Sequence, residues 1–392
     1  MQPTPFLVTG MFRSGTTLAA RMLHANRHVI CASDPYAPIF KLFRNHFGRR
    51  LRPDFDPESP LHDYYFDAFQ HSLFQALQAS DFEVPVDAAL IADAVARVRR
   101  HSTEYSPLIH PLLPELTGRT FAELLRAGLG ILEKAYPKSG ARALGFKEVW
   151  VGEFTPQFLT LAPGSRVVHI VRDPRAVVAS NYVSGARYPL LFLIRQWRKQ
   201  ATLAWLYAQR YPERVLVLKF EDMVSESRAT AEKLCRFLGV EFDPAMIDPS
   251  CLKDGANQPW TQNTSYTTLP EAAPSPRTEG FNRSAVEKWR SALPESYLRV
   301  IDRLTCFEMK SFGYEPLCPS GPAASLDMDL LLENDPTQLS DWIKPYSQYD
   351  YFREMLEENA RHQIMGTGRR LAAKAEARLA LDSEAYAHLT RA

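Results

Sequence analysis

Short apolar runs alternate with segments of helical spacing along the chain as far as residue 240. Five β-prone runs are predicted as strands, and the most apolar of them resemble strands buried in a parallel sheet: Phe6–Thr9, His28–Ala32, Arg142–Phe146, Arg166–Val171 and Arg214–Leu218. Apolar positions at helical spacing follow the strands, for example Leu18, Met22 and Leu23 within Thr16–Ala25. Strands alternating with helices predict an α/β fold, in which a parallel sheet is flanked by helices.

Two regions depart from this alternation. Residues 48–118 are rich in Pro, His, Asp and aromatic residues, and their helical spacing predicts a helical insertion, which we expect to bind the acceptor of any reaction. The stretch Pro316–Pro322 reads as a boundary, so we expect a main domain over residues 1–318 and a helical extension over residues 319–392. A charged helical extension of this kind packs as a solvated helix or mediates homo-oligomerisation.

Composition narrows the class of protein. The 392 residues include 46 basic and 45 acidic side chains, a balance that argues against nucleic-acid binding. The longest apolar run, Tyr188–Ile194, is too short to cross a bilayer, and the N-terminus lacks the pattern of a signal peptide. Five scattered cysteines without a C-x-x-C pair indicate a reducing compartment, so we expect a cytoplasmic protein without stable membrane insertion. The ten histidines show no metal-binding spacing, and no metal is expected.

The first candidate site is the loop G-M-F-R-S-G-T-T at residues 10–17. Gly10, Gly15 and Thr17 fit the phosphate-binding pattern G-x-x-x-x-G-K-[ST], but Thr16 replaces the lysine. A glycine-bearing turn before a helix points backbone N–H groups at an anion smaller than a triphosphate. Its expected donors are Arg13, Ser14, Gly15, Thr16 and Thr17. The alternative is a plain strand-to-helix turn with a Ser or Thr cap.

The second candidate site is H-I-V-R-D-P-R-A-V-V-A-S at residues 169–180. Arg172 ends a predicted strand, where ligands of open α/β sheets bind, and Ser180 follows eight residues later, inside the next helix. Both side chains can reach one phosphate. The alternative is a strand-end arginine paired with Asp173. Two anion-binding turns at two strand ends suggest a nucleotide that carries phosphates at both ends.

These motifs resemble those of the PAPS-dependent sulfotransferase family, where PAPS is 3′-phosphoadenosine 5′-phosphosulfate. F-R-S-G-T-T-L is similar to the family's 5′-phosphosulfate loop, and V-R-D-P-R-A-V-V-A-S to its 3′-phosphate motif. The block at residues 215–240 and the segments N-T-S-Y-T-T and F-N-R-S-A-V-E-K-W add to the likeness. The R-S-G-T-T sequence is most similar to the branch with tyrosylprotein and carbohydrate sulfotransferases. The resemblance implies a P-loop-like fold, PAPS as donor and adenosine 3′,5′-bisphosphate (PAP) as product.

The resemblance also implies catalytic residues. Arg13 would be an electrostatic clamp, because arginine does not give up its proton readily. Lys147 stands where tyrosylprotein-type enzymes carry a lysine, although it could instead pair with Glu148. Asp34, 21 residues after Arg13, stands where those enzymes carry a catalytic glutamate, although with Pro35 it could instead cap a helix. The rival bases are His46, His62 and His110.

Further residues are carried over more loosely. Ser265 lies in the segment similar to the family's sulfonyl-binding stretch, and Arg283 and Lys288 are candidates for the phosphates of the nucleotide. Trp289 is either core or an adenine platform. Aromatic residues in and before the insertion suggest an apolar acceptor, unless they are helix-packing contacts: Tyr36, Tyr64, Tyr65, Phe66 and Phe69.

The sequence therefore predicts a sulfotransferase that moves a sulfuryl group from PAPS to a hydroxyl of a small-molecule, lipid or sugar acceptor, with a carboxylate base. One alternative is a small-molecule kinase of the P-loop type, against which the missing lysine counts. The other is a nucleotide-binding relative without catalysis.

Overall fold

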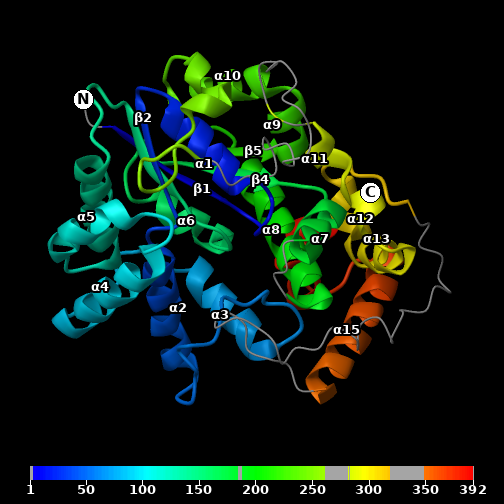
Figure 1. Ribbon diagram of the computed structural model, residues 1–392. Helices are drawn as coiled ribbons and strands as arrows, with labels where there is room; N and C mark the ends of the chain where they lie inside the picture. The colour runs from blue at the N-terminus through cyan, green and yellow to red at the C-terminus, as the bar shows by residue number, and fades with distance from the viewer. Residues whose placement is uncertain (1–2, 184–187, 261–280, 282, 318–347, 392) are drawn as a thin grey trace.

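A five-stranded parallel sheet forms the centre of the structure, a computed structural model that describes residues 3–183, 188–260, 281, 283–317 and 348–391 (Figure 1). The strands are β1 (Thr4–Gly10), β2 (Val29–Ser33), β3 (Ala143–Lys147), β4 (Arg166–Val171) and β5 (Val215–Lys219). Their order is β2-β3-β1-β4-β5. Each strand lies within two residues of a predicted run, so the expected α/β fold is confirmed.

The pairing of the strands decides which loops meet. Gly10 at the end of β1 lies opposite Ile170 of β4, so the loops that follow these strands start side by side. Ser33 at the end of β2 lies opposite Lys147 of β3. The backbone N–H of Asp34 then donates to the carbonyl of Lys147 at 2.7 Å. Both candidate sites and the candidate base therefore share the carboxyl edge of the sheet.

Helices cover both faces of the sheet (Figure 1). One face packs against α1 (Thr16–Ala25), α9 (Phe220–Ser225) and α10 (Ser227–Leu238), which ends at a left-handed Gly239. The other face packs against α2 (Ala37–Leu51), α3 (Ala68–Gln78), α4 (Ala88–Ser102), η1 (Pro107–Glu115), α5 (Phe121–Ala135), α6 (Thr155–Leu159) and α8 (Leu190–Arg210). Within the described ranges, no helix is both long and apolar enough to cross a membrane.

A third apolar cluster lies beyond the β4 side of the sheet. It joins α7 (Pro174–Val183) and the first half of α8 to α12 (Trp289–Ala292) and α13 (Glu295–Lys310). The short helix α11 (Ser284–Glu287) lies against α9. The segment that carries Arg283 and Lys288 is thereby brought towards the second candidate turn.

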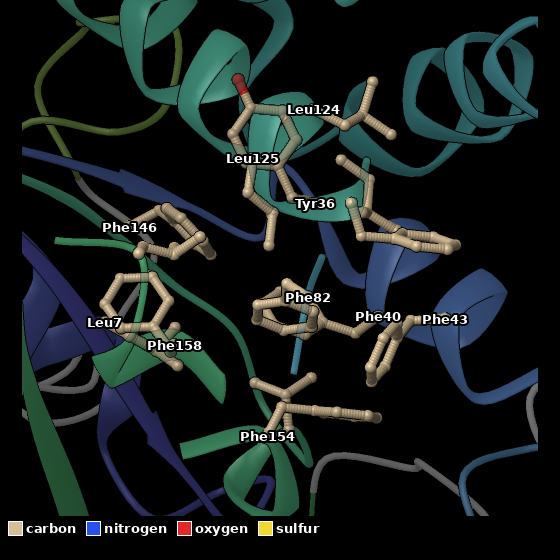
Figure 2. Close-up of a cluster of buried hydrophobic side chains, with 14 of the residues drawn as sticks. Leu7, Tyr36, Phe40, Phe43, Phe82, Leu124, Leu125, Phe146, Phe154 and Phe158 are labelled. Atoms are coloured by element: carbon tan, nitrogen blue, oxygen red, sulfur yellow. The ribbon is translucent and has the colours of Figure 1, made fainter. Parts of the chain in front are cut away.

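The layer of α2 to α5 has an aromatic core of its own, shown in Figure 2. Tyr36 lies in it, in edge contact with Phe146, and its hydroxyl donates to the carbonyl of Gly128 at 2.7 Å. Tyr64 and Tyr65 are also buried. Phe66 and Phe69, which were also predicted to contact the acceptor, are partly buried and pack against the same core. For the three tyrosines the expectation of an acceptor pocket is therefore wrong, and the alternative of helix packing is what the structure shows.

The C-terminal region is helical, as predicted, with α15 (Gln348–Gly366), α16 (Ala373–Ala380) and α17 (Ser383–Leu389). A buried ionic network attaches it to α8. The carboxylate of Glu358 in α15 accepts from Arg195 Nε and from Arg198 Nη2, each at 2.6 Å, and all three side chains are buried. The expected domain boundary at residues 318 and 319 lies outside the described residues.

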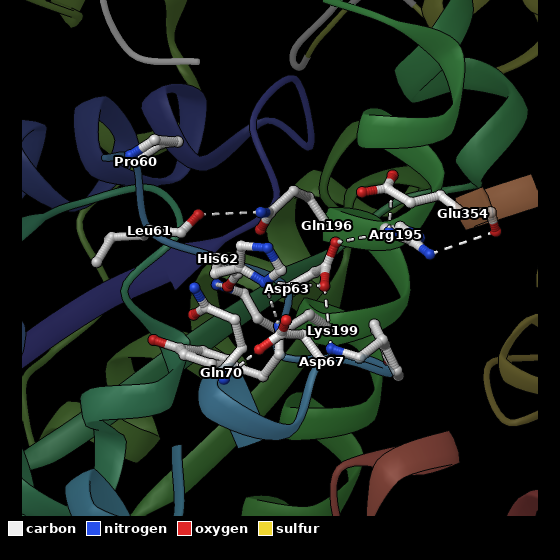
Figure 3. Close-up of polar contacts among 12 residues, drawn as sticks. Pro60, Leu61, His62, Asp63, Asp67, Gln70, Arg195, Gln196, Lys199 and Glu354 are labelled. Atoms are coloured by element: carbon white, nitrogen blue, oxygen red, sulfur yellow. Dashed lines mark hydrogen bonds and ion pairs between the residues drawn. The ribbon is translucent and has the colours of Figure 1, made fainter. Parts of the chain in front are cut away.

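The same network reaches the helical insertion (Figure 3). Arg195 lies 2.9 Å from Glu354 of α15 and 3.9 Å from the buried carboxylate of Asp63. One turn later in α8, Lys199 pairs with the buried Glu153 at 3.1 Å and donates to the carbonyl of His62 at 2.8 Å. Helix α8 thus joins the insertion to the C-terminal helices through charges that have little access to water.

We predict that Glu358→Ala lowers the free energy of unfolding by about 3 to 5 kcal/mol, because it leaves two buried arginines without their shared carboxylate. Urea denaturation measures the change. The control is Glu357→Ala, which removes the neighbouring carboxylate, 32% exposed and 3.6 Å from Arg195, and should cost less than about 1 kcal/mol. Equal effects of the two substitutions would contradict the attachment of α15 through this network.

Candidate active site

Two glycines determine the course of the loop between β1 and α1. Gly10 has a φ of 152°, and a Cβ there would lie 2.3 Å from the carbonyl oxygen of Ile170. Gly15 is the N-cap of α1 with a φ of 85°, and a Cβ there would lie 2.3 Å from the ring of Phe220. Both positions thus need the left-handed freedom and the small size of glycine.

The loop leaves polar groups available for an anion. Helix α1 receives no hydrogen bond from a capping side chain in the described part of the chain, so the capped-turn alternative is not what the structure shows. The first N–H groups of a helix lack partners within the helix and favour an anion. The buried Ser14 hydroxyl also has no hydrogen-bond partner among the described residues, while Thr16 is buried and Thr17 half-buried beside it.

Arg13 has a left-handed backbone, with a φ of 64°, and its guanidinium lies 4.6 Å from the ring centroid of Phe12. A positive φ is uncommon for a residue with a side chain and often marks a functional site. Burial lowers the pKa of Arg13, and the phenols of Tyr188 and Tyr105 act in the opposite direction. Arg13 therefore lies near two tyrosines from different parts of the chain.

Arg172 joins the second turn to the first. Its guanidinium donates from Nη1 to the carbonyl of Arg13 at 2.9 Å and from Nη2 to the carbonyl of Ala285 at 3.0 Å. It lies 4.1 Å from the centroid of Phe220, the ring that also faces Gly15. Burial lowers the pKa of Arg172 to about 10, with Glu221 acting in the opposite direction. Its Nε has no hydrogen-bond acceptor among the described residues, which leaves one donor for a ligand.

The alternative pairing of Arg172 with Asp173 is not the arrangement seen. The carboxylate of Asp173 instead binds Arg175, which donates from Nε at 2.9 Å and from Nη2 at 2.7 Å. Arg175 in turn lies 4.2 Å from the ring of Trp289, which is buried. Trp289 is therefore a packing residue rather than an exposed platform for a base.

The remaining residues predicted to bind the nucleotide or the sulfonyl group lie on other segments of the chain. Ser180 is half-buried in α7, two turns after Arg172. Arg283 is exposed and donates to the carbonyl of Ser225 at 2.8 Å, and Lys288 is exposed between α11 and α12. Ser265 lies outside the described residues. No hydrogen bond or ion pair joins Arg172 to Ser180, Arg283 or Lys288 within the described residues.

The candidate base and the candidate lysine form a buried ion pair. Asp34 follows β2 with a left-handed φ of 49°, and its carboxylate accepts from Lys147 Nζ at the end of β3. Glu148, the alternative partner of Lys147, instead caps α2: its Oε1 accepts from the N–H groups of Tyr36 and, at 2.8 Å, Ala37. Asp34 is thus not the cap of α2, and the helix-cap alternative is wrong.

A histidine that the sequence did not single out approaches this pair. Nε2 of His101, in α4, lies 3.7 Å from the carboxylate of Glu148. Burial acts to lower the pKa of His101, but the neighbouring carboxylate raises it above its usual value, while burial raises the pKa of Glu148. The rival bases have other contacts: His46 with Arg50, His62 with Asp63 and His110 with Ser102.

Aromatic side chains lie beside the loop on the α8 side. The ring of Phe12 lies 5.5 Å from that of Trp150 and 5.1 Å from that of Tyr188, and Tyr188 stacks on Phe192 at 6.0 Å. Trp150 follows Lys147 by three residues and has a φ of 62°. A bulky residue in this conformation points to a constrained site. The sequence offered only one signal for this group, the aromatic residues that flank the motifs.

Comparisons with known proteins cover the part of the chain that carries both turns. The model described as Sulfotransferase family matches residues 5–244. The chain is 28% identical over 173 residues to a 3-alpha-hydroxysteroid sulfotransferase of Cavia porcellus, covering 39% of this chain and 58% of that protein. It is 26% identical over 205 residues to carbohydrate sulfotransferase 5 of Homo sapiens, covering 46% of this chain and 47% of that protein. It thus spans roughly half of each relative's length.

A solved sulfotransferase domain from the olefin synthase of Synechococcus PCC 7002 aligns with 80% of this chain and 96% of that domain, at 17% identity and a TM-score of 0.46.

We predict that Gly15→Ala lowers the free energy of unfolding by about 1 to 3 kcal/mol, because it strains a left-handed cap against the buried Phe220. The control is Gly130→Ala in α5, where an added Cβ would meet no atom within 4 Å. This substitution should raise the free energy of unfolding by about 0.5 to 1 kcal/mol. Urea denaturation of both variants gives the signs. A neutral Gly15→Ala variant would show that the loop is not constrained as described.

Proposed function

Because the chain belongs to the sulfotransferase family, we propose that it transfers a sulfuryl group from PAPS to a hydroxyl group of a small-molecule, lipid or sugar acceptor. The observation that carries this proposal is the hydrogen bond from Arg172 to the carbonyl of Arg13. It holds two anion-binding turns against each other on neighbouring strands. A nucleotide with phosphate groups at both ends is the ligand that such a pair of turns suits.

The available donors support PAPS as this nucleotide. The N-terminal turn of α1, the Ser14 hydroxyl and Arg13 would hold the 5′-phosphosulfate, since each offers a donor or positive charge within one loop. Arg172, through its unsatisfied Nε, and Ser180 would hold the 3′-phosphate. This loop is less suited to bind a triphosphate with magnesium, because Thr16 stands in place of the lysine that contacts the terminal phosphates.

The charges around Asp34 support a simple division of labour. In the transfer, the bond between sulfur and the bridging oxygen breaks, and a new bond forms between sulfur and the acceptor oxygen. Arg13 and Lys147 would stabilise the negative charge on the departing oxygen and on the sulfonyl oxygens. Asp34 would accept the proton of the acceptor hydroxyl. Ser265 is proposed as a further donor to the sulfonyl group.

The acceptor is proposed by class only. The names of the two relatives denote sulfotransferases of a hydroxysteroid and of a carbohydrate, both of which bear hydroxyl groups. The half-buried rings of Phe12, Trp150 and Tyr188 beside Arg13 supply an apolar wall on one side of the centre. An acceptor with an apolar surface next to its hydroxyl would fit this wall.

We predict that PAP binds the wild-type protein and that Arg13→Ala and Arg172→Ala each weaken binding by about tenfold or more, since each removes a charged donor to phosphate. Isothermal titration calorimetry measures the dissociation constants. Arg236→Ala, which removes an exposed arginine of α10, is the control and should leave the affinity unchanged. Tighter binding of ATP than of PAP would favour the kinase alternative instead.

We also predict that Asp34→Asn lowers the turnover of sulfuryl transfer by about 10²-fold or more, while the affinity for PAP changes little. The amide keeps the size of the side chain but cannot accept the proton of the hydroxyl. Glu104→Gln provides the control, because its carboxylate neighbours the exposed Tyr105 and has no proposed role. Full activity of Asp34→Asn would remove Asp34 from the mechanism.

A further inference from the structure

Arg21, in the second turn of α1, is a buried arginine without a hydrogen-bond or ion-pair partner among the described residues. Its side chain is 4% exposed, yet no hydrogen bond or ion pair joins it to any residue that the structure describes. Its guanidinium carbon lies 6.0 Å from the centroid of the Trp260 ring. Buried arginines are normally paired, because an uncompensated buried charge costs several kcal/mol. Arg21 therefore needs a partner that the described protein does not supply.

The acidic groups around Arg21 are already engaged elsewhere. Burial lowers the pKa of Arg21, and nearby Cys31, Tyr136, Asp34 and Asp254 act in the opposite direction. The carboxylate of Asp254 accepts from two backbone N–H groups of its own turn, each at 2.9 Å. The carboxylate of Asp34 pairs with Lys147. Arg21 thus lies near the end of β2, and none of these four groups forms a hydrogen bond or ion pair with it.

A second unsatisfied group lies at the same strand end. Ser33, the last residue of β2, is fully buried, and its hydroxyl has no hydrogen-bond partner among the described residues. Side chains alternate along a strand, so Ser33 points to the same face as Cys31. Cys31 packs in the core cluster that includes α1, the helix that carries Arg21. The serine carbonyl is taken, since it accepts from Ser106 at 2.6 Å, but the hydroxyl is not.

Ser33 lies away from Arg172, the residue proposed to hold the 3′-phosphate. Arg172 follows β4, whereas Ser33 ends β2, and the sheet order places β3 and β1 between them. Three strand spacings correspond to about 14 Å. Asp34, the proposed base, is the residue directly after Ser33. Arg21 and Ser33 thus lie near the proposed base and not at the turn that carries Arg172.

We infer that Arg21 and Ser33 form a subsite for an anionic group, a carboxylate or a phosphate, carried by the acceptor. A guanidinium binds such groups through two parallel hydrogen bonds, and a serine hydroxyl can donate a third. The anionic group would be anchored at the end of β2 while the hydroxyl reaches Asp34. This inference rests on the proposed function, and it narrows the acceptor to hydroxyl compounds that also carry a negative charge.

The first test measures binding of matched neutral and anionic probes to the enzyme saturated with PAP, by isothermal titration calorimetry. The pairs are phenol and 4-hydroxyphenylacetate, benzyl alcohol and 4-(hydroxymethyl)benzoate, and glycerol and glycerol 3-phosphate. In at least one pair, the anionic member should bind about tenfold more tightly, and Arg21→Gln should abolish that advantage. Arg49→Gln, at the exposed far end of α2, should retain it.

The inference is overturned if wild-type protein binds the anionic member of no pair more tightly than the neutral member. It is also overturned if the preference for the anionic member persists in Arg21→Gln. Failure of the proposed function gives a different result, because wild-type protein would then not bind PAP in the first place.

The second test distinguishes a ligand-binding arginine from a structural one. Without ligands, Arg21→Met should melt at the same temperature as wild-type protein or higher, because it replaces an unpaired buried charge with an apolar side chain of similar length. A structural arginine predicts the opposite, a loss of several degrees in Tm. A clear loss of stability in Arg21→Met, without ligand, would overturn the inference whatever the protein binds.

Discussion

The hydrogen bond from Arg172 to the carbonyl of Arg13 is the interaction on which the proposed site depends. It joins the turn after β4 to the loop after β1, two segments about 160 residues apart that parallel pairing brings together at Gly10 and Ile170. Phe220 completes the contact, since its ring lies against Arg172 and closes the space beside Gly15. A loop held in this way presents the first turn of α1 in a fixed direction.

The pairing of β2 with β3 brings the proposed reacting groups together in the same way. Lys147 and Glu148 are consecutive, but they serve different ends: the lysine pairs with Asp34, and the glutamate caps α2. This division leaves Asp34 paired with a cation and not engaged at the start of α2. His101 extends the arrangement into the insertion, because it contacts Glu148 from α4. The insertion thus approaches the proposed reacting centre through His101 and Glu148.

Much of the fold could be predicted from the sequence because it depends on local pattern. Apolar runs located all five strands, and the spacing of Gly10, Gly15 and Arg13 located the loop. Contacts between distant segments were not accessible in this way. The cap formed by Glu148 and the contact of the Phe220 ring with Gly15 depend on which strands become neighbours. The order of the strands in the sheet is not stated directly by the sequence.

The errors have the same origin. Tyr36 and Tyr64 were expected near the acceptor, yet they fill the core beneath α2 to α5, because an aromatic residue looks alike in sequence whether it faces a ligand or a neighbouring helix. The unpaired state of Arg21 was equally invisible, since pairing is decided by geometry. The role of Ser265 stays a prediction, because it lies outside the described residues.

The central claim is that one bisphosphorylated adenosine spans both turns. Calorimetric comparison of PAP with adenosine 5′-monophosphate and adenosine 3′-monophosphate tests it most directly, because each monophosphate engages only one turn. PAP should bind at least about tenfold more tightly than either monophosphate, since two charged contacts act together. Equal affinity of PAP and one of the monophosphates would show that only a single turn binds phosphate, and would contradict the account.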